Sequence, residues 1–233
     1  MAWLTLLILL LSTSGSAQTV TLGGAYRTPR TLTYQLLDAQ GVPTGVLEDT
    51  TLVRVSSTAI VLQRVYHRGA TCPTTCPRIE DRFEWRGSEL LYHSTRDYYS
   101  GHATDYPEGH WWLTDPETLG LATHRATTRV FRSLPVGQCD AAPGPITWTG
   151  TAEIWHAVYA VITHSPYYGS RKGWRLDEVT LFEGNSADVW REEWFFVKDA
   201  ALGMIPVGSA GYRQTPGGTL QWLWRQVLIG IRV

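Results

Sequence analysis

Two stretches in the second half of the chain carry carboxylates that are suited to act as an acid–base pair. "WRLDEVTLF" at 174–182 contains Glu178, and "VWREEWFFV" at 189–197 contains Glu192 and Glu193. If the two stretches form a hairpin, Glu178 lies near Glu192 or Glu193, beside tryptophan rings. Glycoside hydrolysis needs two carboxyls roughly 5–9 Å apart, of which burial keeps one protonated while the other stays ionised.

Two observations count against this catalytic interpretation. A register slip of one residue moves a strand side chain to the opposite face of the sheet, and the sequence does not fix the register. Arg175 and Arg191 are equally near and would neutralise the acids as cross-strand pairs. We therefore favour a charged face in solvent and expect no catalytic residue, with a carbohydrate-active hydrolase that uses a pair among Glu178, Glu192 and Glu193 as the alternative.

A second candidate site lies in "YHSTRDYYSGHATDYPEGHWW" at 92–112. We expect residues 95–112 to form a long loop, because they mix polar, glycine and aromatic residues. Such a loop on a rigid scaffold is typical of binding sites, and Tyr and Trp combine an apolar body with a polar tip. A loop packed only by its own rings is the alternative. The predicted ligand-binding residues, for a carbohydrate or a peptide, are Tyr98, Tyr99, His102, Tyr106, His110, Trp111 and Trp112.

The same segment contains imidazoles and a carboxylate that are able to bind a metal ion, namely His93, His102, Asp105 and His110. Their spacing matches no standard ligand pattern, so the metal site is only a weak alternative and none is expected. Motifs of nucleotide-binding proteins, α/β-hydrolases and zinc proteases are absent from the sequence. No cofactor is therefore expected.

The chain begins "MAWLTLLILLLSTSGSAQT", a short apolar run followed by small residues. This pattern predicts a secretory signal peptide over residues 1–17, cleaved near Ala17, although no Lys or Arg precedes the run. The mature protein is then expected to be extracytoplasmic, either periplasmic or secreted, and disulfides are the default in such compartments. "TCPTTCP" at 71–77 accordingly predicts a Cys72–Cys76 disulfide at a hairpin tip, with pairing of Cys139 to one of these two cysteines left open.

Composition limits the partners. The net charge of −1 argues against nucleic acid, which requires a basic excess. No second apolar run is long enough to span a bilayer, so no stable membrane insertion is expected. The oligomeric state stays open. A non-enzymatic protein with a ligand-binding or structural role is the favoured prediction.

The elements that must position these residues are predicted to be strands. "TLTYQLLD" at 31–38 alternates apolar and polar residues, the period of a half-buried strand, and similar alternation recurs along the chain. We expect a helical turn at 115–120 and prefer a strand to a helix over 187–202. The fold class is mainly β, an antiparallel sandwich, barrel or curled half-barrel built of hairpins, with little helix after the signal peptide. The "PVGQCDAAPGPI" stretch at 135–146 separates a β-rich half at 18–134 from another at 147–233, as a linker between domains or as a long loop within one.

Overall fold

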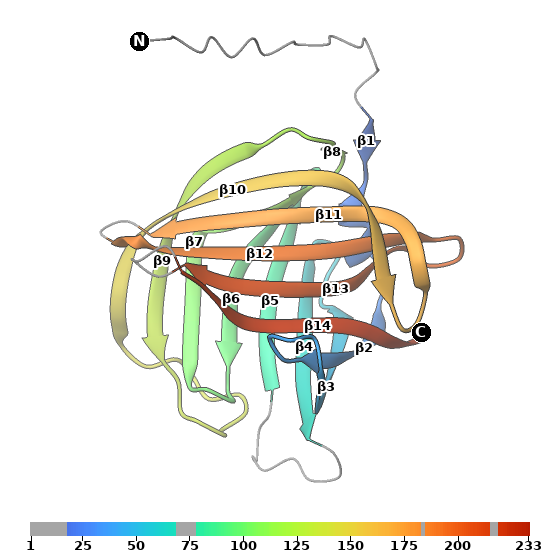
Figure 1. Ribbon diagram of the computed structural model, residues 1–233. Coiled ribbons are helices and arrows are strands. Elements are labelled where there is room, and N and C mark those ends of the chain that lie inside the picture. Colours follow the sequence, from blue (N-terminus) through green and yellow to red (C-terminus); the bar gives the residue numbers. More distant parts are fainter. Residues whose placement is uncertain (1–17, 69–77, 183–184, 215–218) are drawn as a thin grey trace, which may run out of the picture.

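The computed structural model describes residues 18–68, 78–182, 185–214 and 219–233. Twelve antiparallel strands close into a barrel, in the order β10-β11-β12-β13-β14-β2-β3-β4-β5-β6-β7-β9 (Figure 1). The prediction of a mainly β, hairpin-built fold is therefore confirmed, and of the three architectures left open the protein adopts the barrel. The barrel strands are β2 (Arg30–Leu37), β3 (Pro43–Arg54), β4 (Ala59–Arg68), β5 (Arg78–Arg86), β6 (Glu89–Asp97), β7 (His102–Thr114), β9 (Thr123–Ser133), β10 (Ile146–Ser165), β11 (Gly169–Phe182), β12 (Asn185–Asp199), β13 (Gly203–Gln214) and β14 (Leu220–Arg232).

One pairing between distant parts of the chain closes the barrel: the last strand, β14, pairs with β2, with Leu228 opposite Tyr34. The consecutive strands β9 and β10 pair with Arg125 opposite Ile154 and so join the two halves of the chain. The stretches 18–134 and 147–233 thus both supply strands to this barrel, and 135–146 connects β9 to β10. Each barrel strand thus has a partner on both sides, although β7 and β9 pair with each other only over four residues, His102–Asp105 of β7.

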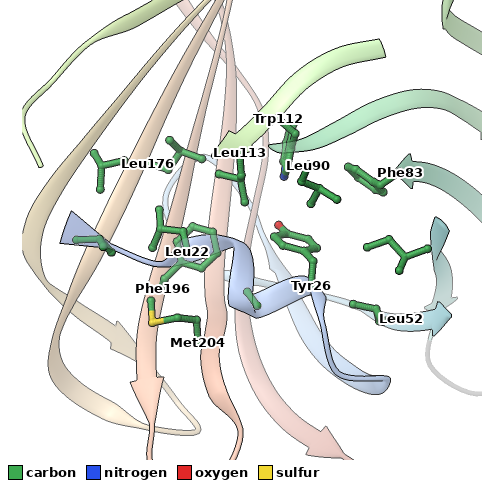
Figure 2. Packing of buried hydrophobic residues seen from close by; sticks show 14 residues of the cluster. Leu22, Tyr26, Leu52, Phe83, Leu90, Trp112, Leu113, Leu176, Phe196 and Met204 are labelled. Atoms are coloured by element: carbon green, nitrogen blue, oxygen red, sulfur yellow. The ribbon is translucent and has the colours of Figure 1, made fainter. Parts of the chain in front are cut away.

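A short N-terminal segment fills one end of the barrel. It comprises β1 (Thr19–Val20), which pairs with β8 (Glu117–Thr118), and the 3₁₀ helix η1 (Leu22–Tyr26). Figure 2 shows Leu22 and Tyr26 among side chains from strands all around the barrel: Leu52, Phe83, Leu90, Trp112, Leu113, Leu176, Phe196 and Met204. η1 passes so close to Trp85 that a Cβ at position 23 would lie 2.6 Å from its ring, which explains the glycine there. The hydrophobic core therefore lies at the η1 end.

Arg30, at the start of β2, ties this segment to the barrel wall. Its buried guanidinium donates to the main-chain carbonyls of Leu202 and Met204, both at 3.0 Å, and to that of Ala25 at the end of η1. Hydrogen bonds from a charged donor are about twice as strong as neutral ones. A single side chain thus joins η1 to the β12–β13 turn and β13.

Several local predictions are wrong. Residues 95–112 do not form a long loop, because β6 runs to Asp97, β7 starts at His102, and only a tight turn separates the two strands. Residues 115–120 are not a helical turn but contain β8, after a cis Asp115–Pro116 bond. The preference for a strand over 187–202 is confirmed through Asp199, the end of β12.

The predicted signal peptide at 1–17 and the cysteines Cys72 and Cys76 lie outside the described residues, so the signal peptide and the disulfide stay predictions. Among the described residues, Asp140 forms an ion pair with Arg78, which follows Cys76 by two positions in the sequence. Cys139 is the immediate neighbour of Asp140. This contact favours the alternative in which Cys139 takes part in the cross-link. Within the described ranges, no helix has both the length and the apolar character needed to cross a membrane.

Candidate site inside the barrel

The barrel encloses two neighbouring cavities. The larger, called the main cavity below, measures about 780 Å³ and extends from Tyr26, at the end of η1, to Thr147 at the start of β10. The smaller, called the side pocket, measures about 120 Å³. Barrels of about eight strands are filled by their side chains or hold one small ligand, and wider ones leave more space. The two cavities share the residues Tyr92, Thr95, Thr104, Trp112, Arg129, Trp190 and Glu192, and therefore lie side by side.

The register of β11 and β12 brings two of the predicted carboxylates together. Glu178 and Glu192 are directly opposite one another in the ladder, and both line the side pocket. Glu193 is at the other parity, where its carboxylate accepts a hydrogen bond from the Tyr212 hydroxyl at 3.1 Å. The expected charged solvent face is thus wrong for Glu178 and Glu192, which point into the barrel. Arg175 pairs instead with Asp177 on the outer face, with Nε 2.7 Å from Oδ1.

Glu178 is held ionised by its neighbours. Its Oε2 lies 2.7 Å from Nε2 of His156, and its Oε1 accepts a hydrogen bond from the Thr180 hydroxyl at 3.3 Å. Burial alone would raise the pKa of Glu178, but the adjacent imidazoles of His110 and His156, together with the hydrogen bonds from His156 and Thr180, outweigh it and hold that pKa below its ordinary value. Glu178 is therefore the anionic member of the carboxylate pair.

Glu192 has the opposite character. Burial first, and the adjacent charge of Glu178 second, raise its pKa to about 7. The indole Nε1 of Trp194 donates to its Oε2 at 3.2 Å, which only partly compensates. Two carboxyls whose environments drive their pKa values apart are the usual arrangement of an acid and a base in one site. Near neutral pH Glu192 is thus able to donate a proton while Glu178 carries the charge.

His110 is the most unusual polar group of the side pocket. It is 3 % exposed, and neither ring nitrogen has a hydrogen-bond partner. Burial lowers the pKa of His110 to about 4, so the imidazole is neutral at physiological pH. Its ring stacks on Tyr106 at 4.9 Å, because the register between β6 and β7 shifts and makes residues 106–109 a bulge. The bulge thus places Tyr106 and His110 side by side in the pocket wall.

The structure distributes the other predicted binding residues over different surroundings. Trp112 and His102 line the main cavity, whereas Tyr98 and Trp111 are buried outside both cavities. Tyr99, in the β6–β7 turn, is 40 % exposed and lines neither cavity. The predicted binding residues therefore do not form one loop surface, and those that face a cavity, Tyr106 and His110 included, face the barrel interior.

The four residues considered as metal ligands, His93, His102, Asp105 and His110, do not converge. The imidazole of His93 contacts the Glu84 carboxylate at 3.2 Å. Asp105 forms an ion pair with Arg132, with Nε 3.1 Å from Oδ2, while His110 lies in the side pocket. Within the described part of the chain, no group of three or more His, Cys, Asp or Glu side chains is placed to hold a metal ion.

The main cavity contains a cluster of polar residues that the sequence analysis did not identify. Nε of Arg64 lies 2.7 Å from the Asp81 carboxylate, which also accepts a hydrogen bond from the Tyr92 hydroxyl at 2.9 Å. Glu48, 2 % exposed, lines the same cavity. The sequence did contain one indication that Asp81 is an interior residue. Asp81 and Phe83 are two residues apart in the same strand, so their side chains lie on the same, apolar face.

Arg129 supplies a positive charge between the two cavities. Its guanidinium lies over the rings of Phe131 and Phe182, at 4.3 and 4.6 Å from their centroids. No ion pair of Arg129 is present among the described residues. Aromatic faces stabilise such a cation when it is removed from water, so Phe131 and Phe182 offset part of the cost of removing Arg129 from water.

Comparisons with family models, with curated proteins and with solved structures find no match to this chain.

Proposed function

We propose that the barrel binds a small amphipathic molecule in its interior. The observation that carries this proposal is the main cavity of about 780 Å³. Its volume falls in the range of about 300–1,000 Å³ that is typical of small-molecule sites. A closed barrel interior suits a small molecule better than a peptide, which binds more readily along a strand edge or an open groove.

The wall of the main cavity has the mixed character that an amphipathic ligand needs. Apolar and aromatic side chains such as Leu62 and Phe83 alternate around the barrel with buried charged groups such as Glu48 and Asp81. Apolar walls supply most of the binding energy, and a few polar groups fix the orientation of the ligand.

A cavity-filling variant tests the proposal. Titration with the neutral fluorescent dye N-phenyl-1-naphthylamine should give saturable binding to the wild type. Thr50→Trp adds a large ring to the wall of the main cavity and should weaken binding by tenfold or more. The matched control is Thr51→Trp, one residue along β3 on the opposite face, where the hydroxyl pairs with that of Thr31 at 3.0 Å. Equal dye binding by both variants would show that the dye binds outside the barrel.

A second function, a carbohydrate-active hydrolase, is favoured by the Glu178–Glu192 pair. Directly opposite strand residues have Cβ atoms about 5 Å apart, so the two side chains can bring their carboxyl groups to the separation of about 5 Å that a retaining mechanism requires. Glu192 would protonate the glycosidic oxygen while Glu178 attacks the anomeric carbon. The leaving alcohol departs, and a glycosyl ester forms on Glu178. Glu192 would then deprotonate a water that cleaves the ester, which restores both carboxyls.

Release of 4-nitrophenol from a panel of 4-nitrophenyl glycosides tests this second function. Activity should fall at least a thousandfold in Glu192→Gln and Glu178→Gln, and stay unchanged in Glu193→Gln, whose carboxyl lies outside the side pocket. If no glycoside is hydrolysed, or if all three variants behave alike, the hydrolase is excluded for those substrates and the binding function stands alone.

We further propose that the protein works outside the cytoplasm, after cleavage near Ala17. The support is the apolar run at 3–11 with the small residues Gly15 and Ala17 after it. N-terminal sequencing of the exported protein should begin at Gln18. Retention of Met1 in the cell-associated protein would refute the export signal.

A further inference from the structure

We propose that the side pocket receives the polar edge of an uncharged, hydroxylated ring, such as a sugar, whose apolar substituent lies in the main cavity. This inference rests on the proposed binding function and names the class of its ligand. It depends on three features: an imidazole without hydrogen-bond partners, aromatic walls that a six-membered ring can pack against, and nearly equal numbers of positive and negative side chains around the cavities.

The unsatisfied imidazole is that of His110. Leaving a buried polar group without a hydrogen bond costs free energy, so such groups are rare and call for an explanation. A neutral imidazole offers one N–H donor and one acceptor nitrogen. A hydroxyl group is both donor and acceptor and therefore satisfies either nitrogen. The adjacent Glu178 and Glu192 supply further acceptors for ligand hydroxyls.

The side pocket and its junction with the main cavity fit a small ring. The side pocket alone, at about 120 Å³, is smaller than the cavity of about 150 Å³ that accepts benzene, but it adjoins the main cavity along seven shared residues. A six-membered ring therefore lies where the two cavities meet, with its polar edge in the side pocket and its substituent in the main cavity. The rings of Tyr106, Trp112 and Trp190 line the pocket and offer flat apolar faces to the C–H face of such a ring.

The charges around the two cavities favour an uncharged ring. The described lining residues include four arginines and five carboxyls, and burial raises the pKa of one of these carboxyls, Glu192, to about 7. The two signs are thus nearly balanced before any ligand binds. A charged head group would leave an uncompensated charge inside the barrel, which is costly. Arg129 is the group most able to attract an anion, and the test below includes one.

Three probes that each contain an eight-carbon chain separate the contributions of the sugar ring, the alkyl chain and the charge to the binding affinity. They are n-octyl β-D-glucoside, 1-octanol and octanoate. Displacement of N-phenyl-1-naphthylamine, at probe concentrations below micelle formation, gives the affinities. The glucoside should bind about tenfold more tightly than octanol, the gain expected from one or two hydrogen bonds to buried groups. Octanoate should bind no better than octanol.

His110→Phe removes one to two hydrogen bonds to the glucoside, so the affinities for glucoside and octanol should come to within about twofold of each other. Octanol binding itself should change little. His110→Gln keeps a donor and an acceptor and should retain part of the preference for the glucoside. The matched control, His164→Phe, replaces an exposed imidazole of β10 that contacts the Ser170 hydroxyl at 3.1 Å. This control should behave as the wild type.

Each other outcome overturns the inference in a recognisable way. Equal binding of glucoside and octanol by the wild type would mean that the side pocket recognises no hydroxylated ring. Tightest binding of octanoate would mean that Arg129 selects an anion. Either result leaves the proposed binding function intact. If neither the dye nor any of the three probes binds, the proposed function itself fails.

Discussion

The interior placement of Glu178 and Glu192 predicts how the stability of the protein depends on pH. Burial and the charge of Glu178 raise the pKa of Glu192 from an ordinary value of 4.5 to about 7. The folded protein therefore holds this proton more tightly than the unfolded chain. The resulting stabilisation is fully present below about pH 4.5 and is lost as the pH rises through 7. Glu192→Gln has no proton to lose and should lack this dependence.

The size of the effect follows from the shift. Each pKa unit corresponds to about 1.4 kcal/mol, so the full shift corresponds to about 3 kcal/mol. Glu192 is only partly buried, and its proton is coupled to Glu178. We therefore expect that, between pH 4.5 and pH 8, the wild type loses about 2 kcal/mol of unfolding free energy relative to Glu192→Gln. Titrating groups that do not interact with Glu192 contribute equally to both proteins and cancel in the difference, and the interaction with Glu178 is part of the effect that is measured.

Urea unfolding followed by tryptophan fluorescence measures this difference. With an m value of about 2–3 kcal/mol per molar, the separation of the two midpoints should change by roughly 1 M across this pH range. Glu193→Gln is the matched control, because its carboxyl is on the outer face beside the Tyr212 hydroxyl. Its unfolding midpoints should stay parallel to those of the wild type at every pH. Parallel midpoints for Glu192→Gln as well would refute the reasoning, and so would a wild type that gains relative stability with rising pH.

Three further predictions concern the core, the buried imidazole and the disulfide. Leu22→Ala, which removes a fully buried side chain from η1, should cost about 2–5 kcal/mol in urea unfolding, and a cost below 1 kcal/mol would argue against the η1 core. His110 loses its proton more easily when folded, since burial lowers its pKa from 6.5 to about 4; His110→Phe should therefore lose less stability than the wild type as the pH falls from 6.5 to 4, and an equal loss would contradict the burial. Peptide mapping without reduction should find Cys139 in a cross-link with Cys72 or Cys76, and a Cys72–Cys76 peptide would instead support the hairpin-tip disulfide.

The alternation of apolar and polar residues was enough to predict the strands and hairpins. It predicted β2 from residues such as Tyr34, whereas for β12 the run of aromatic residues at 194–196 favoured a strand over a helix. It could not predict closure of the barrel, because closure depends on pairing between β14 and β2, which lie far apart in the sequence. Local periodicity contains no information about such distant partners.

The candidate site was predicted in part. The sequence identified Glu178 and Glu192 as a possible pair, but their placement inside the barrel depends on the register of β11 and β12. The residues around His110 were misassigned to a loop because the segment 95–112 mixes polar, glycine and aromatic residues. In the structure Pro107 and Gly109 occupy the bulge in β7, beyond Asp105, where the pairing of β7 with β9 ends. A proline in a strand is tolerated at such an interruption of the ladder.

The central claim, that a small amphipathic molecule binds inside the barrel, is tested most directly by the indole N–H signals of the protein in ¹H–¹⁵N NMR spectra. Trp112, Trp190 and Trp194 line the main cavity, whereas Trp155 is 41 % exposed and stacks on His124 outside it. Trp→Phe variants assign the four signals. Titration with N-phenyl-1-naphthylamine should shift the three interior signals and leave that of Trp155 unchanged. A shift of the Trp155 signal alone would contradict the account.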